Sequence, residues 1–209
     1  MKKVTKVIEV YSFEELASEK AKEKACQQVG DSITNAPFWY DDTFDLFVEK
    51  CKDYGMNVDE KDIKFSGFGS QGDGASFTCN NIDTKKILKS LGIGLLEELE
   101  EKVLDYIYEV NISRTSWRAY HEQTVHVEVF LDEDALVEEE EEGIIQDIHD
   151  IADTLEFKLE KLKDDLCKSL YNELRQEYEY FHSEEYVSDL AYYNKMLFLA
   201  NGIVYDWGE

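Results

Sequence analysis

The sequence predicts an α+β protein, and three observations support this fold class. Short segments in which apolar residues alternate, at residues 63–65, 75–79, 108–112 and 125–131, are typical of strands. In other segments apolar residues recur every three or four positions, as in amphipathic helices. The longest such stripe, from Ile144 to Leu174, predicts one long helix. We therefore expect small antiparallel β-sheets or hairpins packed with several helices and one long C-terminal helix.

The N-terminal segment is expected to form a strand over residues 3–10, followed by a helix. Ser12 and Glu15 have the spacing of a capping box, in which each side chain bonds the backbone N–H of the other residue. The helix is then expected to run from Phe13 to about Val29 and to stop at Gly30, because glycine commonly ends helices.

Other local signals place the later helices and turns. Pro37 suits the first turn of a helix that is expected to end at Gly55. Asp83 and Ser183 are expected to cap two further helices at their N-termini. Asn201-Gly202 favours positive φ angles, so it predicts a tight hairpin turn near the C-terminus.

The chain is long and apolar enough to bury a core, since 43% of its 209 residues are hydrophobic. We expect an α+β core over residues 1–133. Residues 134–209 are expected to add the long helix, a C-terminal helix and a hairpin, packed on that core as one domain. The apolar stripe of the long helix can pack within one chain, or it can form the seam of a homodimer.

The charge of the chain restricts its partners. There are 47 Asp and Glu against 22 Lys and Arg, which gives a formal net charge of −25. Such a field repels nucleic acids and anionic membranes, so we expect no direct contact with either and favour a basic protein partner. The alternative interpretation of the negative charge is that it serves only to keep the protein in solution. The sequence shows no signal-peptide core and no apolar run long enough to span a membrane, so a cytoplasmic protein is expected. The cysteines are scattered and do not have the spacing of metal ligands, so we expect no metal and no cofactor.

Residues 67–72, with the sequence GFGSQG, match the nucleotide-binding pattern G-x-G-x-x-G. In a dinucleotide site the last glycine opens a helix, whose N-terminus receives the phosphates. Here the following residues alternate as in a strand, and the carboxylate of Asp73 would repel a phosphate. A glycine-rich turn of a β-hairpin is therefore favoured, and nucleotide binding is the alternative.

The stretch FSGFGSQGDGASF, at residues 65–77, resembles a signature found in a family of tailed-phage and prophage proteins. The segments YSFEELASEKAKEKA, YHEQTVHVEV and LYNELRQEYEYFHSEE resemble other parts of that family in the same order, so the resemblance spans nearly the whole chain. The family often has an aromatic residue where this chain has Gly69. The resemblance implies a phage accessory protein and supplies no catalytic residues.

These observations together predict a phage-encoded, non-enzymatic inhibitor acting in the cytosol of the host bacterium. Its partner is expected to be a basic, nucleic-acid-binding surface of a bacterial defence or nucleic-acid-processing protein, such as a CRISPR or restriction effector. Carboxylates on a rigid surface can occupy a basic channel as phosphates do. The residues expected to bind the partner are Asp132, Glu133, Asp134, Glu138, Glu139, Glu140, Glu141 and Glu142.

Two alternative functions are retained. The first is a protein that binds and sequesters a signalling nucleotide, with contacts from Gln71, Asp73, Arg114, Tyr120 and His121. The second is a metal-dependent enzyme. It is less favoured because the Asp-Ile-Lys sequence at residues 62–64 matches only the end of a nuclease signature, whose metal site also needs an upstream carboxylate. The net charge of −25 would moreover oppose the approach of a phosphate backbone, and we assign no catalytic residue.

Overall fold

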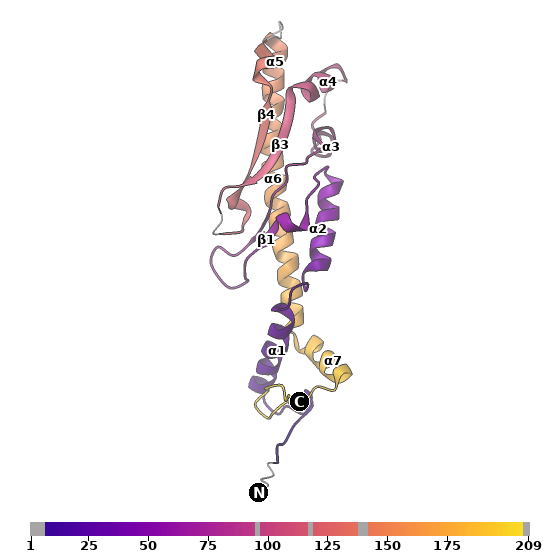
Figure 1. Cartoon of the computed structure of the whole chain (residues 1–209), viewed down its shortest axis with the longest axis vertical. Helices are drawn as coiled ribbons and strands as arrows, with labels where there is room; N and C mark the ends of the chain where they lie inside the picture. The colour runs from indigo at the N-terminus through magenta and orange to yellow at the C-terminus, as the bar shows by residue number, and fades with distance from the viewer. Residues whose placement is uncertain (1–6, 95–96, 117–118, 138–141, 207–209) are drawn as a thin grey trace, which may run out of the picture. The chain divides into compact units, whose positions relative to one another are not determined.

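The structure is a computed structural model that describes residues 7–94, 97–116, 119–137 and 142–206 (Figure 1). It confirms the α+β class, with two two-stranded antiparallel sheets and seven α-helices among the described residues. In chain order the elements are α1 (Glu19–Thr34), α2 (Asp41–Asp53), the 3-10 turn η1 (Glu60–Asp62), β1 (Ile63–Phe65), β2 (Ala75–Phe77), α3 (Thr84–Ser90), α4 (Glu97–Tyr106), β3 (Ile107–Arg114), the 3-10 turn η2 (Glu122–Thr124), β4 (Val125–Leu131), α5 (Glu133–Val137), α6 (Glu142–Phe181) and α7 (Glu184–Asn194).

The chain divides into two compact units. The terminal unit joins the two ends of the sequence, Met1–Asp41 and Leu174–Glu209, and the central unit comprises Asp42–Glu173. Helix α6 supplies residues to both units. The packing of residues 134–209 on the core as one domain, and a homodimer through the long helix, stay predictions.

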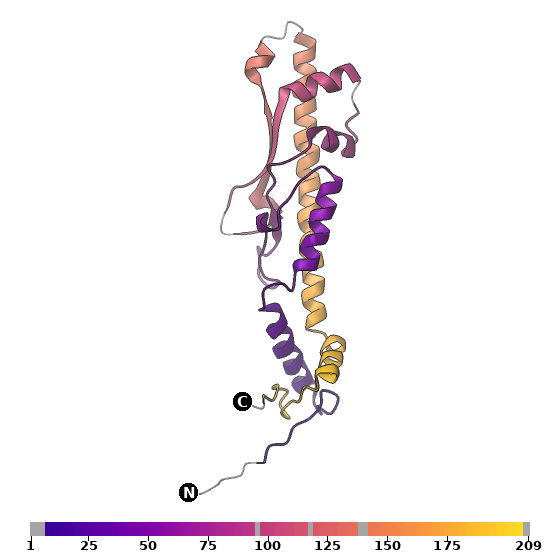
Figure 2. The same ribbon diagram turned by 45° about the vertical axis from the view of Figure 1, so that its right-hand side comes forward.

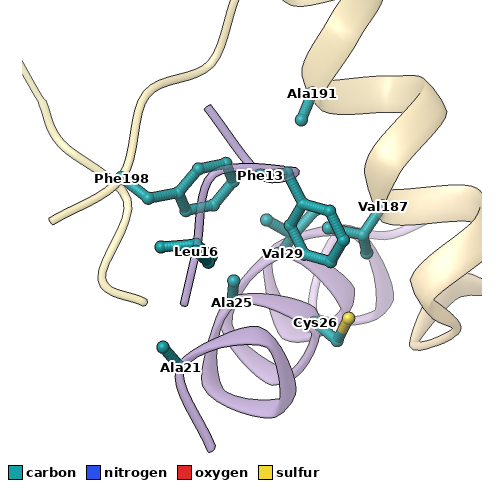
Figure 3. Close-up of a cluster of buried hydrophobic side chains, with 9 residues drawn as sticks. All are labelled: Phe13, Leu16, Ala21, Ala25, Cys26, Val29, Val187, Ala191 and Phe198. Atoms are coloured by element: carbon teal, nitrogen blue, oxygen red, sulfur yellow. The ribbon is translucent and has the colours of Figure 1, made fainter. Parts of the chain in front are cut away.

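The core of the terminal unit lies between α1, α7 and the chain segments next to them (Figure 3). Tyr11 and Phe198 exchange two backbone hydrogen bonds of 2.8 Å each. The ring of Phe13 meets that of Phe198 edge to face, with centroids 5.9 Å apart. The buried members of this cluster are Phe13, Leu16, Ala21, Ala25, Cys26, Val29, Val187, Ala191 and Phe198. Segments from both ends of the sequence thus share one apolar core.

Helix α1 begins six residues later than the sequence predicts. Ser12 and Glu15 do interact, with the backbone N–H of Ser12 2.8 Å from the Glu15 carboxylate. The intervening residues form a turn, however, which directs both Phe13 and Leu16 into the core. The N-cap is Ser18, whose hydroxyl accepts a hydrogen bond from a backbone N–H in the first turn. Burial of two large apolar side chains therefore decides where the helix starts.

Two further predictions near the N-terminus are wrong. Residues 7–10 form no strand, and the first strand-like contact is the isolated bridge at Tyr11; residues 3–6 lie outside the described part of the chain. Pro37 lies in the turn before α2, because Phe38 has a φ of 90°, which no α-helix accommodates.

Gly30 does not end α1, which continues to Thr34. A Cβ at Gly30 would lie 2.4 Å from the imidazole ring of His182, so the absent side chain is what lets this ring pack on the helix. The ring is fixed by hydrogen bonds to the Tyr178 carbonyl at 2.8 Å and to the Asp31 carboxylate at 3.2 Å. The glycine thus allows a close contact between α1 and the turn that follows α6.

Replacing Gly30 by alanine is expected to lower the free energy of unfolding by about 2 kcal/mol, because the added methyl group displaces a packed ring. Helix propensity alone predicts the opposite, a gain of about 1 kcal/mol. Urea denaturation followed by circular dichroism measures the difference. In a His182→Ala background the clash is gone, so Gly30→Ala is expected to become stabilising; destabilisation by the same amount in both backgrounds would refute the contact.

The central unit contains both sheets. Strands β1 and β2 pair antiparallel, with Ile63 opposite Phe77, and β3 and β4 pair with Ile112 opposite Val127, as the alternation predicts. An isolated bridge of two hydrogen bonds between Cys79 and Ile112 links the continuation of β2 to β3. In both views the β3–β4 hairpin lies along the part of α6 that belongs to this unit (Figure 2).

Two side chains of α6 cover the outer edge of β4. The carboxylate of Glu160 accepts the Val127 N–H at 2.9 Å, and the amine of Lys163 donates to the Val125 carbonyl at 2.7 Å. Lys163 is only 1% exposed and also donates to Glu160 at 2.6 Å and to Asp164 at 2.7 Å. Because an uncovered edge invites further strand pairing, this ion cluster stands where a third strand would otherwise bind.

Helix α2 ends at Asp53, two residues before the predicted Gly55. Three other local predictions are confirmed. Asp83 caps α3 and Ser183 caps α7, each accepting a hydrogen bond from a backbone N–H of the first turn. Gly202, with a φ of 84°, ends a hairpin turn in which the Leu199 N–H donates to the Ile203 carbonyl at 2.8 Å.

Candidate functional site

The segment from just before η2 to the middle of α6 is strongly acidic. Residues 119–157 contain fourteen Asp and Glu and no Lys or Arg. We call this stretch the acidic segment. It includes β4, α5 and the first part of α6, all within the central unit.

Three of the predicted partner-binding residues lie together between β4 and α5. Asp132, Glu133 and Asp134 are all exposed. Asp132 caps α5, since its carboxylate accepts the Ala135 N–H at 3.0 Å, while Glu133 and Asp134 occupy the first helical turn. Acidic side chains are favourable there because they face the positive end of the helix dipole. The three carboxylates thus have a local structural role and remain accessible to a partner.

The glutamate run divides at the edge of the described chain. Glu138, Glu139, Glu140 and Glu141 lie outside the described residues. Glu142 begins α6 and is exposed.

The sequence reasoning missed four exposed carboxylates farther along α6. Asp147, Asp150, Asp153 and Glu156 follow at intervals of three residues, or about 4.5 Å along the helix axis. The apolar stripe that predicts the long helix could have located them, because they fall between its apolar positions and so belong to the exposed side of that helix. They extend the acidic surface along a rigid element.

The glycine-rich stretch is the turn of the β1–β2 hairpin, as its flanking residues predict. Gly72 has a φ of 99°. The carboxylate of Asp73 accepts hydrogen bonds from the backbone N–H groups of Gly69 and Ser70. A bound phosphate needs such N–H groups. Since an internal carboxylate already occupies them, the loop has no free cradle for a phosphate.

Aromatic contacts fix the same loop against α6. The ring of Phe68 stacks between Phe65 and Tyr171, with centroid distances of 6.1 and 5.5 Å. The hydroxyl of Tyr171 donates to the Gly67 carbonyl at 3.1 Å. The loop is therefore anchored at its base, which suits a structural role.

The five residues predicted to contact a nucleotide are only partly brought together. The guanidinium of Arg114 lies over the ring of Tyr120 at 5.2 Å. Next to Tyr120, His121 packs against the backbone of the β1–β2 loop and accepts the Gln123 N–H at 3.2 Å. Asp73 faces its own loop, and Gln71 is exposed at the tip. Of the five, Arg114 and Tyr120 form a contacting pair.

A cavity of about 390 Å³ opens beside Arg114. It includes Asp62 and Lys64 of the nuclease-like sequence. Among the described residues no group of three or more His, Cys, Asp or Glu could hold a metal ion. The cavity is lined by Lys61, Asp62, Lys64, Thr78, Cys79, Asn80, Asn111, Ile112, Ser113 and Arg114.

The cysteines are free and buried. Burial raises the pKa of Cys167 to about 12 and also raises the pKa values of Cys51 and Cys79 above the ordinary thiol value. A nucleophilic cysteine needs a substantial thiolate fraction near neutral pH. These three thiols are therefore core side chains of the central unit.

This combination defines an acidic α+β protein with a long helix and a small polar cavity. Residues 39–184 match the domain of unknown function DUF8835, and the chain belongs to this family. No curated protein and no solved structure matches the chain. In the described part of the chain, none of the helices has the length and apolar character needed to cross a membrane.

Proposed function

We propose that this chain is a non-enzymatic inhibitor that binds a basic, nucleic-acid-binding surface of another protein through its acidic segment. The observation that carries the proposal is a row of carboxylates from Asp132 to Glu156, with no Lys or Arg between them, whose described members are all exposed. Most of the described carboxylates of this row lie on α5 and α6, so they are held on helices and need little ordering on binding.

The mechanism is electrostatic attraction followed by steric exclusion. A local excess of negative charge raises the rate at which a basic partner meets this surface. Once bound, the acidic segment covers the groove in which the partner would otherwise hold a nucleic acid. The affinity of such a complex falls as salt increases, because exposed charges are screened.

The resemblance to tailed-phage and prophage proteins supports a phage origin and a bacterial target. Defence proteins such as CRISPR and restriction effectors carry basic nucleic-acid channels of the required kind. We therefore propose this class of partner, in the cytosol of the host bacterium.

The test measures displacement of fluorescent duplex DNA from purified CRISPR and restriction effectors. The segment variant combines Asp132→Asn, Glu133→Gln, Asp134→Asn and Asp147→Asn. The matched control combines Glu14→Gln, Glu23→Gln, Glu185→Gln and Asp189→Asn, which neutralise the same number of exposed carboxylates in the terminal unit.

The segment variant is expected to need about tenfold more protein for half-displacement, and the control less than about twofold more. Potency of the unmodified chain is also expected to fall as salt rises. Equal losses in the two variants, displacement that is insensitive to salt, or no displacement from any effector would each contradict the proposal.

A further inference from the structure

The residues that line the cavity beside Arg114 include more cations than carboxylates, unlike the chain as a whole. Its lining contains three cations, Lys61, Lys64 and Arg114, and one carboxylate, Asp62. The whole chain has more than twice as many acidic as basic residues. Cations gathered around a hollow in so acidic a protein favour an anionic ligand.

The cations are held in place by neighbouring groups. A guanidinium nitrogen of Arg114 lies 3.4 Å from the Ser76 hydroxyl, and the guanidinium also lies over the Tyr120 ring. The amine of Lys64 donates to the Lys61 carbonyl at 2.7 Å, and that of Lys61 pairs with Asp59 at 2.7 Å. Arginine and lysine together are the usual ligands of phosphate oxygens.

Neutral polar groups complete the lining. Asn80, Thr78, Asn111 and Ser113 contribute amides and hydroxyls. The side-chain oxygen of Asn111 is buried and has no hydrogen-bond partner among the described residues, while its nitrogen donates to Glu109 at 2.8 Å. A buried acceptor without a donor is costly, and a ligand hydroxyl would satisfy it.

The shape and chemistry of the cavity narrow the ligand class. About 390 Å³ falls within the range of small-molecule sites. The lining includes no aromatic ring among the described residues, so it provides no platform on which a base could stack. Phosphate-binding cations beside an acceptor for a hydroxyl group instead fit a phosphorylated sugar.

We propose that this cavity binds a sugar phosphate, either free or as the ribose phosphate part of a nucleotide. Lys64 and Arg114 contact the phosphate, and the Asn111 side-chain oxygen accepts a hydrogen bond from a sugar hydroxyl. The site lies outside the acidic segment and is independent of the inhibitory function proposed above.

Isothermal titration calorimetry of the full chain with ribose 5-phosphate, AMP, ribose and inorganic phosphate tests this site. Lys64→Gln removes one cation from the exposed rim of the cavity, and Lys161→Gln removes one from an exposed position on α6 outside the lining. Asn111→Leu removes the acceptor. Circular dichroism verifies that each variant is folded.

Ribose 5-phosphate is expected to bind more tightly than inorganic phosphate, and ribose alone not measurably. Lys64→Gln is expected to weaken binding about tenfold and Lys161→Gln less than about twofold. Asn111→Leu is expected to remove the preference for ribose 5-phosphate over inorganic phosphate. AMP that binds at least as tightly as ribose 5-phosphate identifies a nucleotide as the source of the sugar phosphate, and weaker AMP binding identifies the free sugar phosphate.

The proposed site would be refuted if neither ribose 5-phosphate nor AMP bound. It would also be refuted if inorganic phosphate bound as tightly as ribose 5-phosphate, or if Lys64→Gln and Lys161→Gln weakened binding equally.

Discussion

Replacing Lys163 by methionine is expected to lower the free energy of unfolding by about 3 kcal/mol, because it breaks a buried ion cluster. The change leaves the carbonyls of Val125 and Glu122 without the amine that donates to them at 2.7 and 2.9 Å. It also leaves the carboxylates of Glu160 and Asp164 without their counter-ion. Guanidinium denaturation followed by circular dichroism measures the loss.

Lys168→Met on the same helix is the matched control. That amine is exposed and lies 3.9 Å from Glu122, so its removal is expected to change stability by less than about 0.5 kcal/mol. A Lys163 variant within that same margin would show that the cluster does not hold the β3–β4 hairpin.

The pH dependence of stability, compared between the unmodified chain and Lys163→Met, gives a second check. Burial acts to lower the pKa of Lys163, but hydrogen bonds to Asp164 and Glu160 outweigh it and raise the pKa above the ordinary value of 10.5. A raised lysine pKa stabilises the folded state fully below the unfolded pKa. The stability difference between the unmodified chain and Lys163→Met is therefore expected to be constant from neutral pH up to pH 10.5, where both carboxylates are ionised, and to shrink as pH rises through the folded pKa.

Gly202→Ala is expected to lower the free energy of unfolding by about 3 kcal/mol, through two separate costs. The φ of 84° lies in a region that costs an alanine about 1–2 kcal/mol. In addition, the new Cβ would lie 1.9 Å from the Ala21 carbonyl oxygen. Because this obstacle is backbone of α1, the chain itself has to shift, at a cost of about 1–3 kcal/mol. Thermal and urea unfolding measure the loss.

Gly72→Ala measures the cost of the positive φ angle without the cost of a steric clash. Gly72 has a φ of 99°, and a Cβ there would meet nothing within 4 Å. Its replacement is expected to cost only about 1–2 kcal/mol, the price of the backbone angle. Equal losses at the two glycines would show that the approach of Gly202 to α1 adds nothing.

Local signals predict much of the fold. The strand pairs around Ile63 and Ile112 follow from alternation alone, and the caps at Asp83 and Ser183 follow from single polar residues that bond the next helical turn. These signals suffice because the interactions behind them join residues only a few positions apart. The predicted glycine-rich hairpin is confirmed for the same reason.

The wrong sequence-based predictions concern places where residues far apart in the chain determine the local structure. Ser12 and Ser18 offer two competing starts for α1, and the choice depends on burying Phe13 against Phe198, which is far along the chain. Gly30 has the residue type of a helix end, but its packing against His182 keeps it inside the helix. No pattern within a short window contains either partner.

The same limit applies to the candidate sites. The acidity of residues 119–157 is visible in the sequence, and its helical placement follows from the apolar stripe of α6. The cavity could not be predicted, because it joins residues 61–64, 78–80 and 111–114. These segments are brought together by strand pairing and by the bridge between Cys79 and Ile112, so the positions of the cations around the cavity depend on tertiary structure.

The composition of the terminal unit has a consequence for how the chain is made. Its core needs Phe13 from one end of the sequence and Phe198 from the other. During synthesis the ribosome releases the whole central unit before Phe198 emerges, so the central unit can fold first. Meanwhile α1 leaves the ribosome with its apolar face uncovered. The N-terminal segment therefore waits longest for the residues that cover it.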